Sequence, residues 1–462
     1  MAFLIGGANS AAADTGYNIE NSLRYNDGDT PRLYIAHGSA GNRRIFTISC
    51  WIKMGLVPQF SYITGTQTGG DNYFFCGFRD NGQIGMQQGD DSMLIATKSL
   101  SRDPSAWYHL VFAFDTTQGT DTNRVKIYIN GVSQDLCYPE AFTTAPDYPA
   151  QNLELFFNTT DNMGVGSRGD GDASVDGYMA DYYFIDGTAY DADDFGETNA
   201  DGIWISKEAK DDLTFGTNGF FLEFKETGTS QNSSGMGADT SGEDNHLAVS
   251  NLAATDQCTD TPTNNFATAN PLGSNSSAFA EGNLLTTGDT GVNWSLGACS
   301  TIGFKKGKWY AEFKPTDAGD NTYVGIQKDG NQLAEDADYQ YPDGNLSYNT
   351  YAGKKIEGNG TSSADETSYG DTYTDDDIVS VAIDMDNRNL YFYKNGTIQN
   401  SGTAAFTSSN IAADTFYFFF TAGYNDSIVH HNYGSPAFAI SSGNADANGY
   451  GNFEYAVPSG YF

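Results

Sequence analysis

The stretch VKIYINGVSQD, residues 125–135, combines two signals of a β-hairpin. Its first half alternates apolar residues with others, which is the period of a strand that buries one face. The alternation stops at an Asn-Gly pair, residues 130–131, and this dipeptide favours the tight turn between two antiparallel strands. The same pattern returns in NLYFYKNGTIQN, residues 389–400, with Asn-Gly at 395–396. The repeat indicates two β-domains of similar architecture in one chain.

The composition of the chain is that of a folded, acidic, β-rich protein. The 462 residues include 59 Asp and Glu against 23 Lys and Arg, which gives a formal net charge of −36. Such a charge repels nucleic acid and anionic membranes, so we expect neither as a partner. Aromatic residues make up 14% of the chain, whereas disordered acidic chains are poor in them. With 53 glycines and no long apolar period of 3.6 residues, the sequence predicts an all-β fold.

Strand-like runs gather in two blocks that polar sequence separates. The blocks cover residues 21–226 and 284–440, and Gly, Asp, Asn or Pro bound each run, as in a β-sandwich. Residues 227–283 are poor in apolar side chains and predict an extended polar connector, to which HLAVSNLA (246–253) adds one short strand. We interpret residues 1–20 as an N-terminal anchoring arm. Residues 441–462 form a C-terminal tail or a strap over a neighbour, and their aromatic end favours docking.

Cysteine usage and apolar runs bear on the setting of the protein. The five cysteines show no metal-ligand spacing and no Cys-x-x-Cys pair, which suits buried free thiols. The first residues lack the basic start and the apolar length of a secretory signal. No stretch reaches the length of about 18 apolar residues that a membrane span needs, so we expect no membrane insertion.

Four segments of the first block occur in the order of a known family. They are NSLRYNDGDTPRLYIAHGSAGNRRIFTISCWIKMG (21–55), WYHLVFAFD (107–115), VKIYINGV (125–132) and GYMADYYFIDGTAYD (177–191). They resemble a laminin-G-like domain of the concanavalin A-type lectin/glucanase superfamily. In the second block KGKWYAEFKP, YVGI, DIVSVAIDMDNRNLYFYKNG and FYFFFTAG resemble a SPRY domain. Both resemblances imply antiparallel jelly-roll-like β-sandwiches, here two of them joined by the connector.

Two further stretches carry a resemblance of a different kind. FGTNGFFLEFK, residues 215–225, and NLAATDQCTDTPTNNFATANPL, residues 251–272, look like structural proteins of tailed, marine-type bacteriophages that are described as tail fibre-like. The resemblance implies a non-enzymatic, fibre-like virion protein, made in the cytoplasm of a bacterial host, that presents lectin-like sandwiches to a host-surface glycan.

The same resemblance implies partners. The N-terminal arm would hold other virion structural proteins, and the chain would be part of a homo-oligomer or a larger assembly. Two alternatives stay open: a decoration protein on the head (capsid) surface, and a free carbohydrate-binding or carbohydrate-active protein.

Patterns that would indicate catalysis are weak. Glucanases of this superfamily resemble one another in an E-x-D-x-x-E strand, whose carboxylates flank a glycosidic bond. No Glu here has that spacing, and LEFKE (222–226) places Lys225 where the Asp would stand. The sequence places no Ser or Cys beside His109, which we interpret as a strand histidine satisfied by a neighbour. His430 and His431 alternate across a strand and cannot share one metal. We therefore expect no enzyme activity.

Acidic residues offer one candidate metal site. Asp170, Asp172 and Asp176 lie in the Gly-rich stretch GDGDASVDG, residues 169–177. Calcium takes about six to eight oxygen ligands, which three carboxylates and free carbonyls of a turn could supply. Laminin-G-like domains often carry calcium in a rim loop, so calcium is the candidate cofactor and a solvated turn is the alternative. A second acidic run, residues 375–377, is interpreted as a charged strand edge that blocks aggregation.

A tyrosine-rich loop is the candidate ligand site. Tyr339, Tyr341, Tyr348 and Tyr351 lie in ADYQYPDGNLSYNTYAGKK, residues 337–355. Tyrosine offers a flat apolar face and a hydroxyl group at a small entropy cost, which suits recognition of a sugar or a protein. SPRY domains resemble one another in binding through such loops. Packing at the rim of a sandwich is the alternative.

Overall fold

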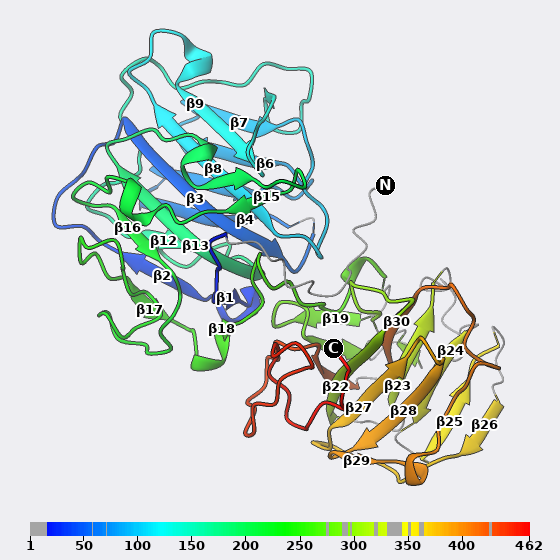
Figure 1. Cartoon of the computed structure of the whole chain (residues 1–462). Helices are drawn as coiled ribbons and strands as arrows, with labels where there is room; N and C mark the ends of the chain where they lie inside the picture. Colours follow the sequence, from blue (N-terminus) through cyan, green and yellow to red (C-terminus); the bar gives the residue numbers. More distant parts are fainter. Residues whose placement is uncertain are drawn as a thin grey trace. The chain divides into compact units, whose positions relative to one another are not determined.

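Figure 1 shows the computed structural model of the chain, which consists of antiparallel sheets. The chain divides after Asn265 into two compact units. The structure describes residues 16–57, 59–70, 72–273, 277–288, 294–295, 298–317, 322–329, 344–349, 353–359, 365–424 and 427–462. The predicted all-β fold is confirmed, because this part of the chain forms strands and short 3-10 turns. The turns are η1 (Asp27–Asp29), η2 (Asp121–Asn123), η3 (Ala192–Asp194), η4 (Lys210–Asp212), η5 (Ala254–Asp256), η6 (Pro271–Gly273) and η7 (Asn400–Gly402).

Two eight-stranded sheets form the first unit. The β3 sheet has the order β10-β9-β8-β3-β13-β1-β18, with β16 paired to β13, and the β5 sheet has the order β11-β7-β6-β5-β4-β12-β2-β17. The strands of the β3 sheet are β10 (Val132–Ser133), β9 (Val125–Ile129), β8 (Tyr108–Asp115), β3 (Ile45–Met54), β13 (Gly177–Asp186), β1 (Ser22–Tyr25), β18 (Gln257–Cys258) and β16 (Phe220–Leu222). Those of the β5 sheet are β11 (Leu136–Cys137), β7 (Met93–Thr97), β6 (Ile84–Gln88), β5 (Asn72–Phe78), β4 (Ser61–Gly69), β12 (Met163–Val165), β2 (Arg32–Ile35) and β17 (Ala248–Ser250). A ribbon of β14 (Gly196–Thr198) and β15 (Trp204–Ser206) completes the unit.

The core of the first unit lies between its two sheets. The alternation in β8 places Leu110, Phe112 and Phe114 in this core, where all three side chains are fully buried. Phe46 of β3 stacks on Phe114 with ring centroids 4.4 Å apart. Phe74 of the other sheet meets Phe46 edge-on at 6.0 Å. Aromatic contacts therefore join the two layers.

The outer face of the β3 sheet is apolar as well, and the chain between β13 and β16 covers it. Val111 and Tyr183 project to this face and form a second cluster with Phe195 and Phe215. The ring of Tyr183 stacks on that of Phe221 at a centroid distance of 4.0 Å. A sheet with two apolar faces needs a packed layer against each face. Here the first unit supplies both layers from its own chain.

The segment predicted as an extended connector, residues 227–283, differs from that expectation in its first part. The short strand expected at 246–253 is present as β17, but β17 and β18 pair with β2 and β1 of the first unit, and Leu247 lies in its core. The ammonium group of Lys53 lies 2.8 Å from the carboxylate of Asp260, and both side chains are buried. The indole of Trp107 donates a hydrogen bond to the same carboxylate. Pairing with distant strands orders this polar sequence, and local composition does not report such pairing.

The last residues of the predicted anchoring arm also lie on the first unit. The hydroxyl of Thr263 donates to the carbonyl of Ile19 at 2.8 Å, and that of Ser206 donates to the carbonyl of Tyr17 at 3.2 Å. Ile19 is buried. The remainder of the arm, residues 1–15, lies outside the described residues.

The second unit is also built from two antiparallel sheets. The β22 sheet has the order β19-β20-β31-β22-β27-β28-β29, and the β23 sheet has the order β21-β30-β23-β24-β25-β26. The first contains β19 (Ser277–Ala280), β20 (Leu285–Gly288), β31 (Ile428–Asn432), β22 (Lys308–Asp317), β27 (Val379–Asp384), β28 (Asn389–Lys394) and β29 (Thr397–Ile398). The second contains β21 (Trp294–Ser295), β30 (Tyr417–Tyr424), β23 (Thr322–Lys328), β24 (Asn345–Asn349), β25 (Lys354–Glu357) and β26 (Asp365–Ser368). Rings meet across the two layers, as Phe313 meets Phe419 at 6.3 Å.

Residues 441–462 dock on the β22 sheet of their own unit. Phe453 and Tyr461 are buried in a cluster with Tyr310 of β22. The ring of Phe453 meets that of Tyr310 edge-on at 5.2 Å. The backbone N–H of Tyr310 donates to the carbonyl of Phe462 at 2.7 Å, which extends the ladder of β22. The segment predicted as a tail or a strap is therefore a strap over its own domain.

A buried carboxylate holds this strap. Glu312 of β22 is fully buried and accepts hydrogen bonds from the backbone N–H groups of Glu454 and Tyr455, at 2.9 and 2.8 Å. Burial raises the pKa of Glu312, although these hydrogen bonds favour its charged form. One buried carboxylate thereby accepts from two consecutive backbone donors of the strap.

Both Asn-Gly turns are left-handed at each residue. The φ angles are 49° at Asn130 and 78° at Gly131, and 46° at Asn395 and 75° at Gly396. Such angles are those of the type I′ turn, whose twist matches that of the strands it joins. The turns connect β9 to β10 and β28 to β29. The two predicted hairpins are confirmed.

The asparagine of each turn also extends the strand ladder. The side-chain oxygen of Asn130 accepts from the backbone N–H of His109 at 2.7 Å, and that of Asn395 accepts from Ile378 at 2.9 Å. The backbone N–H of each asparagine donates to the carbonyl of the same neighbour, at 2.8 and 2.9 Å. The repeated motif therefore serves the same structural role in both units.

We expect Asn130→Ala to lower the free energy of unfolding of the first unit by about 2 kcal/mol. Alanine costs roughly 1–2 kcal/mol in the left-handed region and lacks the side-chain acceptor. Asn130→Gly keeps the turn conformation and should cost about 1 kcal/mol. Calorimetry of the full chain measures both, and Asn395→Ala should shift the transition of the second unit instead. Equal losses for the alanine and glycine variants would contradict the role of the left-handed angle.

Candidate functional site

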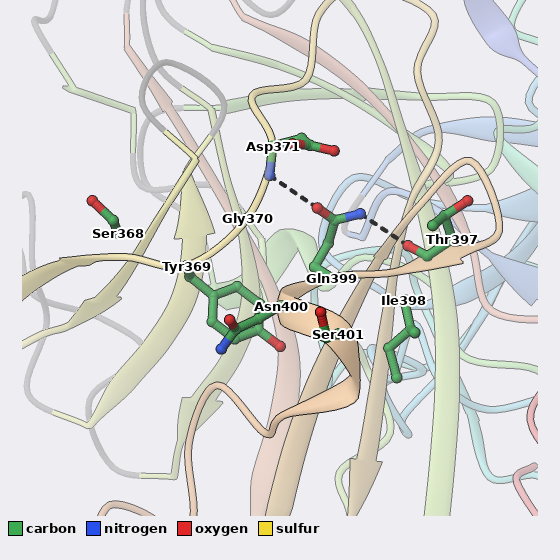
Figure 2. Close-up of a pocket in the computed structure, with 9 residues that line it drawn as sticks. All are labelled: Ser368, Tyr369, Gly370, Asp371, Thr397, Ile398, Gln399, Asn400 and Ser401. Carbon is green, nitrogen blue, oxygen red and sulfur yellow. Dashed lines mark hydrogen bonds between the residues drawn. The ribbon is translucent and has the colours of Figure 1, made fainter.

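A pocket opens on the second unit where its two sheets end next to each other. β26 is the last strand of the β23 sheet, and β29 is the last strand of the β22 sheet. The pocket has a volume of about 470 Å³ and lies between the turn that follows β26 and the turn that follows β29 (Figure 2). Its lining residues are Ser368, Tyr369, Gly370, Asp371, Thr397, Ile398, Gln399, Asn400 and Ser401.

A buried glutamine ties the two sides of the pocket together. The side-chain oxygen of Gln399 accepts from the backbone N–H of Asp371 at 2.9 Å, and its amide nitrogen donates to the carbonyl of Thr397 at 2.9 Å. Figure 2 shows both bonds as dashed lines. One amide therefore links the turn after β26 to strand β29 and satisfies polar groups from both sides.

Two tyrosine side chains fix the turn after β26. The hydroxyl of Tyr348 donates to the carbonyl of Asp371, and that of Tyr369 donates to the carbonyl of Thr403 at 2.9 Å. A Cβ at Gly370 would lie only 2.6 Å from the Tyr348 hydroxyl, so this close approach requires glycine. The wall of the pocket is thus held by side chains that are themselves buried.

The exposed rim of the pocket is a left-handed turn. The φ angles of Asn400, Ser401 and Gly402 are 49°, 52° and 81°. Two consecutive non-glycine residues in this region cost about 1–2 kcal/mol each, and such strain gathers at functional sites. The side chains of Asn400 and Ser401 are exposed at the mouth.

The lining chemistry of the pocket is polar and nearly uncharged. Amides come from Gln399 and Asn400, hydroxyl groups come from serines and Thr397, and Asp371 supplies one carboxylate. None of the nine lining residues is a cation. Such a surface offers donors and acceptors to hydroxyl or amide groups of a ligand but no partner for an anion.

The structure corrects one of the tyrosines predicted to bind a ligand. Tyr348 lies in β24, is fully buried, and stacks on Phe392 of the opposite sheet at 5.2 Å. The residue belongs to a strand rather than a loop, and its side of the strand faces the core. Tyr339, Tyr341 and Tyr351 lie outside the described residues.

The sequence interpretation missed the residues of the pocket. Gln399, Asn400 and Ser401 directly follow the second Asn-Gly hairpin in TIQNSG, residues 397–402. The density of Asn, Ser and Gly there indicates a turn, which is the available signal. Residues 368–371 form the other side of the pocket, but strands β27 and β28 separate them from residues 397–402 in the sequence. The local sequence therefore does not show that the two segments meet.

The three carboxylates predicted to bind calcium do not converge in the structure. The guanidinium group of Arg168 pairs with Asp170 at 2.8 Å and with Asp172 at 3.0 Å. The hydrogen bonds from Arg168 are the main cause that lowers the pKa of Asp170. Asp176 is fully buried, away from that exposed pair. In the part of the chain that the structure describes, no group of three His, Cys, Asp or Glu side chains is placed to hold a metal ion.

His109 is satisfied on both ring nitrogens, as the sequence interpretation expected. The indole of Trp204, which can only donate, gives its hydrogen to Nδ1 at 3.0 Å. The ring proton is therefore on Nε2, which donates to the hydroxyl of Ser49 at 2.9 Å. In this tautomer His109 cannot take the proton of Ser49, so the pair is not a nucleophile and its base. Burial lowers the pKa of His109 to about 3.

The second unit contains a similar histidine. His431 is fully buried between the hydroxyl groups of Thr286 and Tyr433, at 2.9 and 3.0 Å. Burial lowers its pKa to about 3 as well. His430 is only half-buried, which agrees with the predicted alternation of the two histidines.

We expect acid to destabilise the first unit through His109. Between pH 6.5 and pH 3 the unfolded chain binds a proton that the folded chain does not, so stability is full above 6.5 and is lost as the pH falls. The loss attributable to His109 should reach about 2 kcal/mol at pH 5. His109→Gln supplies one donor and one acceptor without titrating. Calorimetry from pH 7 to pH 5 should show a smaller loss for this variant, and parallel curves would contradict the buried neutral histidine.

We expect Gln399→Ala to loosen the wall of the pocket. The variant removes the acceptor of the Asp371 N–H, so the second unit should lose about 1–2 kcal/mol. Hydrogen exchange at the Asp371 amide should become faster. Ser401→Gly is the matched control because its exposed side chain lies in the same turn. Unchanged exchange at Asp371 would show that the amide does not tie the two sides together.

Two domain families match this chain. The Concanavalin A-like lectin/glucanases superfamily matches residues 27–193, and the SPRY domain matches residues 307–435. The chain carries a laminin-G-like domain and a SPRY domain. Domains of these two types are typically non-catalytic binding modules, and the lectin-like fold suggests carbohydrate binding or adhesion. The pocket lies within the SPRY match.

A solved SPRY domain is similar to part of this chain. The crystal structure of the SPRY domain of human HERC1 matches with 18% sequence identity and a TM-score of 0.29, over 35% of this chain and 96% of that one. The comparison with curated proteins found no match. Within the described residues, none of the helical segments has the length and apolar character needed to cross a membrane.

Proposed function

We propose that this chain is a non-enzymatic adhesion protein whose SPRY domain binds a neutral glycan at the pocket between β26 and β29. The polar, almost uncharged lining carries this proposal, since hydroxyl groups of a sugar can both donate and accept hydrogen bonds. The strained rim at Asn400 and Ser401 supports it, because the turn presents two polar side chains at a cost in stability. The match of the first domain to a lectin superfamily is consistent with this ligand class.

Removal of the rim side chains tests the pocket. Asn400→Gly combined with Ser401→Gly keeps the left-handed turn and should reduce affinity for the preferred neutral oligosaccharide by about tenfold or more, through lost hydrogen bonds. The measurement is a screen of the full chain on immobilised neutral glycans, followed by calorimetric titration. Ser408→Ala with Ser409→Ala is the control, because both serines are exposed in the same unit. Equal binding by the rim variant and the control would remove the pocket from the proposal.

We also propose that the protein is a fibre-like subunit of a tailed-phage virion. Support comes from the resemblance of residues 215–225 and 251–272 to such proteins. Other virion proteins would hold the N-terminal arm, and many copies in an oligomer or larger assembly would turn weak single sites into strong adhesion. Calcium at the loop of Asp170 and Asp172 would have to displace the guanidinium group of Arg168 from both carboxylates.

Labelling of particles tests the location. Gold-tagged antibody against the SPRY domain is applied to purified particles from the source of this sequence and imaged. Gold at the tail is the expected result. Gold spread over the head would identify the protein as a decoration subunit instead of a fibre subunit. Particles without gold would contradict the virion assignment.

A further inference from the structure

The outer face of the β5 sheet carries aromatic side chains that the core of the first unit does not use. Phe74 of β5 belongs to the core, so strand alternation places Tyr73 and Phe75 on the opposite face. In β4, Ile63 belongs to the core, and its neighbour Tyr62 projects to the same outer face. Three rings therefore gather on a face that points away from the β3 sheet.

Packing explains two of these rings. Tyr62 stands opposite Gly77 in the register of β4 and β5, and Phe75 stands opposite Gly65. A Cβ at Gly77 would come within 2.9 Å of the Phe75 ring, and one at Gly65 within 2.5 Å of the Tyr62 ring. Each ring thus packs against a glycine, an arrangement that stabilises glycine-containing strands, and the two rings meet edge-on at 4.8 Å.

Packing does not explain Phe60 in the same way. Its ring stacks on Phe75 with centroids 4.8 Å apart and an angle of 13°, and meets Tyr62 edge-on at 5.8 Å. Phe60 is nevertheless 41% exposed. One face of the ring covers Phe75, so the exposed area of this side chain belongs to its other face and its edges. We call Phe60, Phe75 and Tyr62 the aromatic platform.

Hydrogen-bonding groups border the platform on the side of β6. The amide of Gln87 donates to the hydroxyl of Tyr73 at 2.7 Å and accepts from the guanidinium group of Arg79 at 3.0 Å. The same guanidinium lies 5.6 Å from the centre of the Phe75 ring. Amide, hydroxyl and guanidinium groups therefore lie directly beside the aromatic rings of the platform.

The loop that was predicted to bind calcium borders the other side. The guanidinium group of Arg168 lies 5.9 Å from the centre of the Tyr62 ring. Asp170 and Asp172 pair with this group, so its charge is compensated. Beside Tyr62 the platform therefore carries no net positive field, which favours a neutral ligand over an anionic one on this side.

We propose that the aromatic platform is a second carbohydrate site, at which Phe60 stacks against the apolar face of a neutral pyranose ring. A sugar ring has C–H groups on its face and hydroxyl groups at its rim, which matches a flat ring bordered by amide, hydroxyl and guanidinium groups. A protein partner fits less well, because a stable interface needs roughly 800 Å² per partner. In the described part of residues 59–97, Phe60 is the one large hydrophobic side chain that is strongly exposed.

This site extends the proposed glycan binding to the first unit, and affinity electrophoresis of the full chain tests it. Native gels contain hydroxyethylcellulose, dextran or galactomannan. We expect at least one of these neutral polysaccharides to retard the wild-type chain. Phe60→Ala should weaken that retardation about tenfold or more, whereas Phe60→Trp should keep it, since tryptophan preserves a flat aromatic face. Phe60→Leu keeps an apolar cover on Phe75 but no flat ring, so it should behave like the alanine variant.

Phe142→Ala is the matched control, because Phe142 is a phenylalanine of the same unit with the same 41% exposure. It should migrate like the wild type. Equal retardation of the Phe60→Ala and wild-type chains, equal loss in the Phe142→Ala chain, or a wild-type chain that no gel retards would overturn the platform. The Asn400→Gly, Ser401→Gly chain separates the two sites. Binding lost in that chain but kept in Phe60→Ala would leave the pocket proposal standing and overturn this one.

Discussion

The structure depends on one constraint, which is that the strands of this chain carry apolar side chains on both faces. In β8, Phe112 faces the core between the sheets and Val111 faces the opposite way. A two-layer sandwich buries only one face of each sheet. The chain therefore supplies extra layers from its own sequence: the segment between β13 and β16 covers the β3 sheet, and residues 441–462 cover the β22 sheet.

The two candidate binding surfaces lie on parts of the sheets that these covering segments leave open. The aromatic platform is on the outer face of the β5 sheet, where Phe60 stays 41% exposed. The pocket lies where β26 and β29 end their sheets, so that turns rather than further strands form its walls (Figure 2). Rigid strands support both surfaces, and a buried side chain, Phe75 or Gln399, holds the exposed one in place. Preorganisation of this kind lowers the entropy cost of binding a flexible ligand such as a glycan.

Sequence reasoning succeeded where the deciding interaction is local. The Asn-Gly turns require positive φ angles, which few residues other than asparagine and glycine adopt at low cost, so both hairpins could be located in advance. The alternation in β8 likewise follows from strand geometry. Sequence reasoning failed where a partner distant in the chain decides the position of a segment or side chain. The polar residues 227–265 belong to the first unit because β17 and β18 pair with strands more than 200 residues earlier, and Tyr348 is buried because β24 faces Phe392.

The sequence by itself therefore determined the class of the fold, the two hairpins and the division into two β-rich blocks, because backbone angles and the two-residue period are set by neighbouring residues. Only the tertiary structure decided which side chains meet. Lys53 pairs with the buried Asp260, Trp204 sets the tautomer of His109, and Gln399 joins the turns of the pocket. Each of these contacts depends on the register of strands that are distant in the chain, and a shift of one residue would turn every side chain of a strand to the other face.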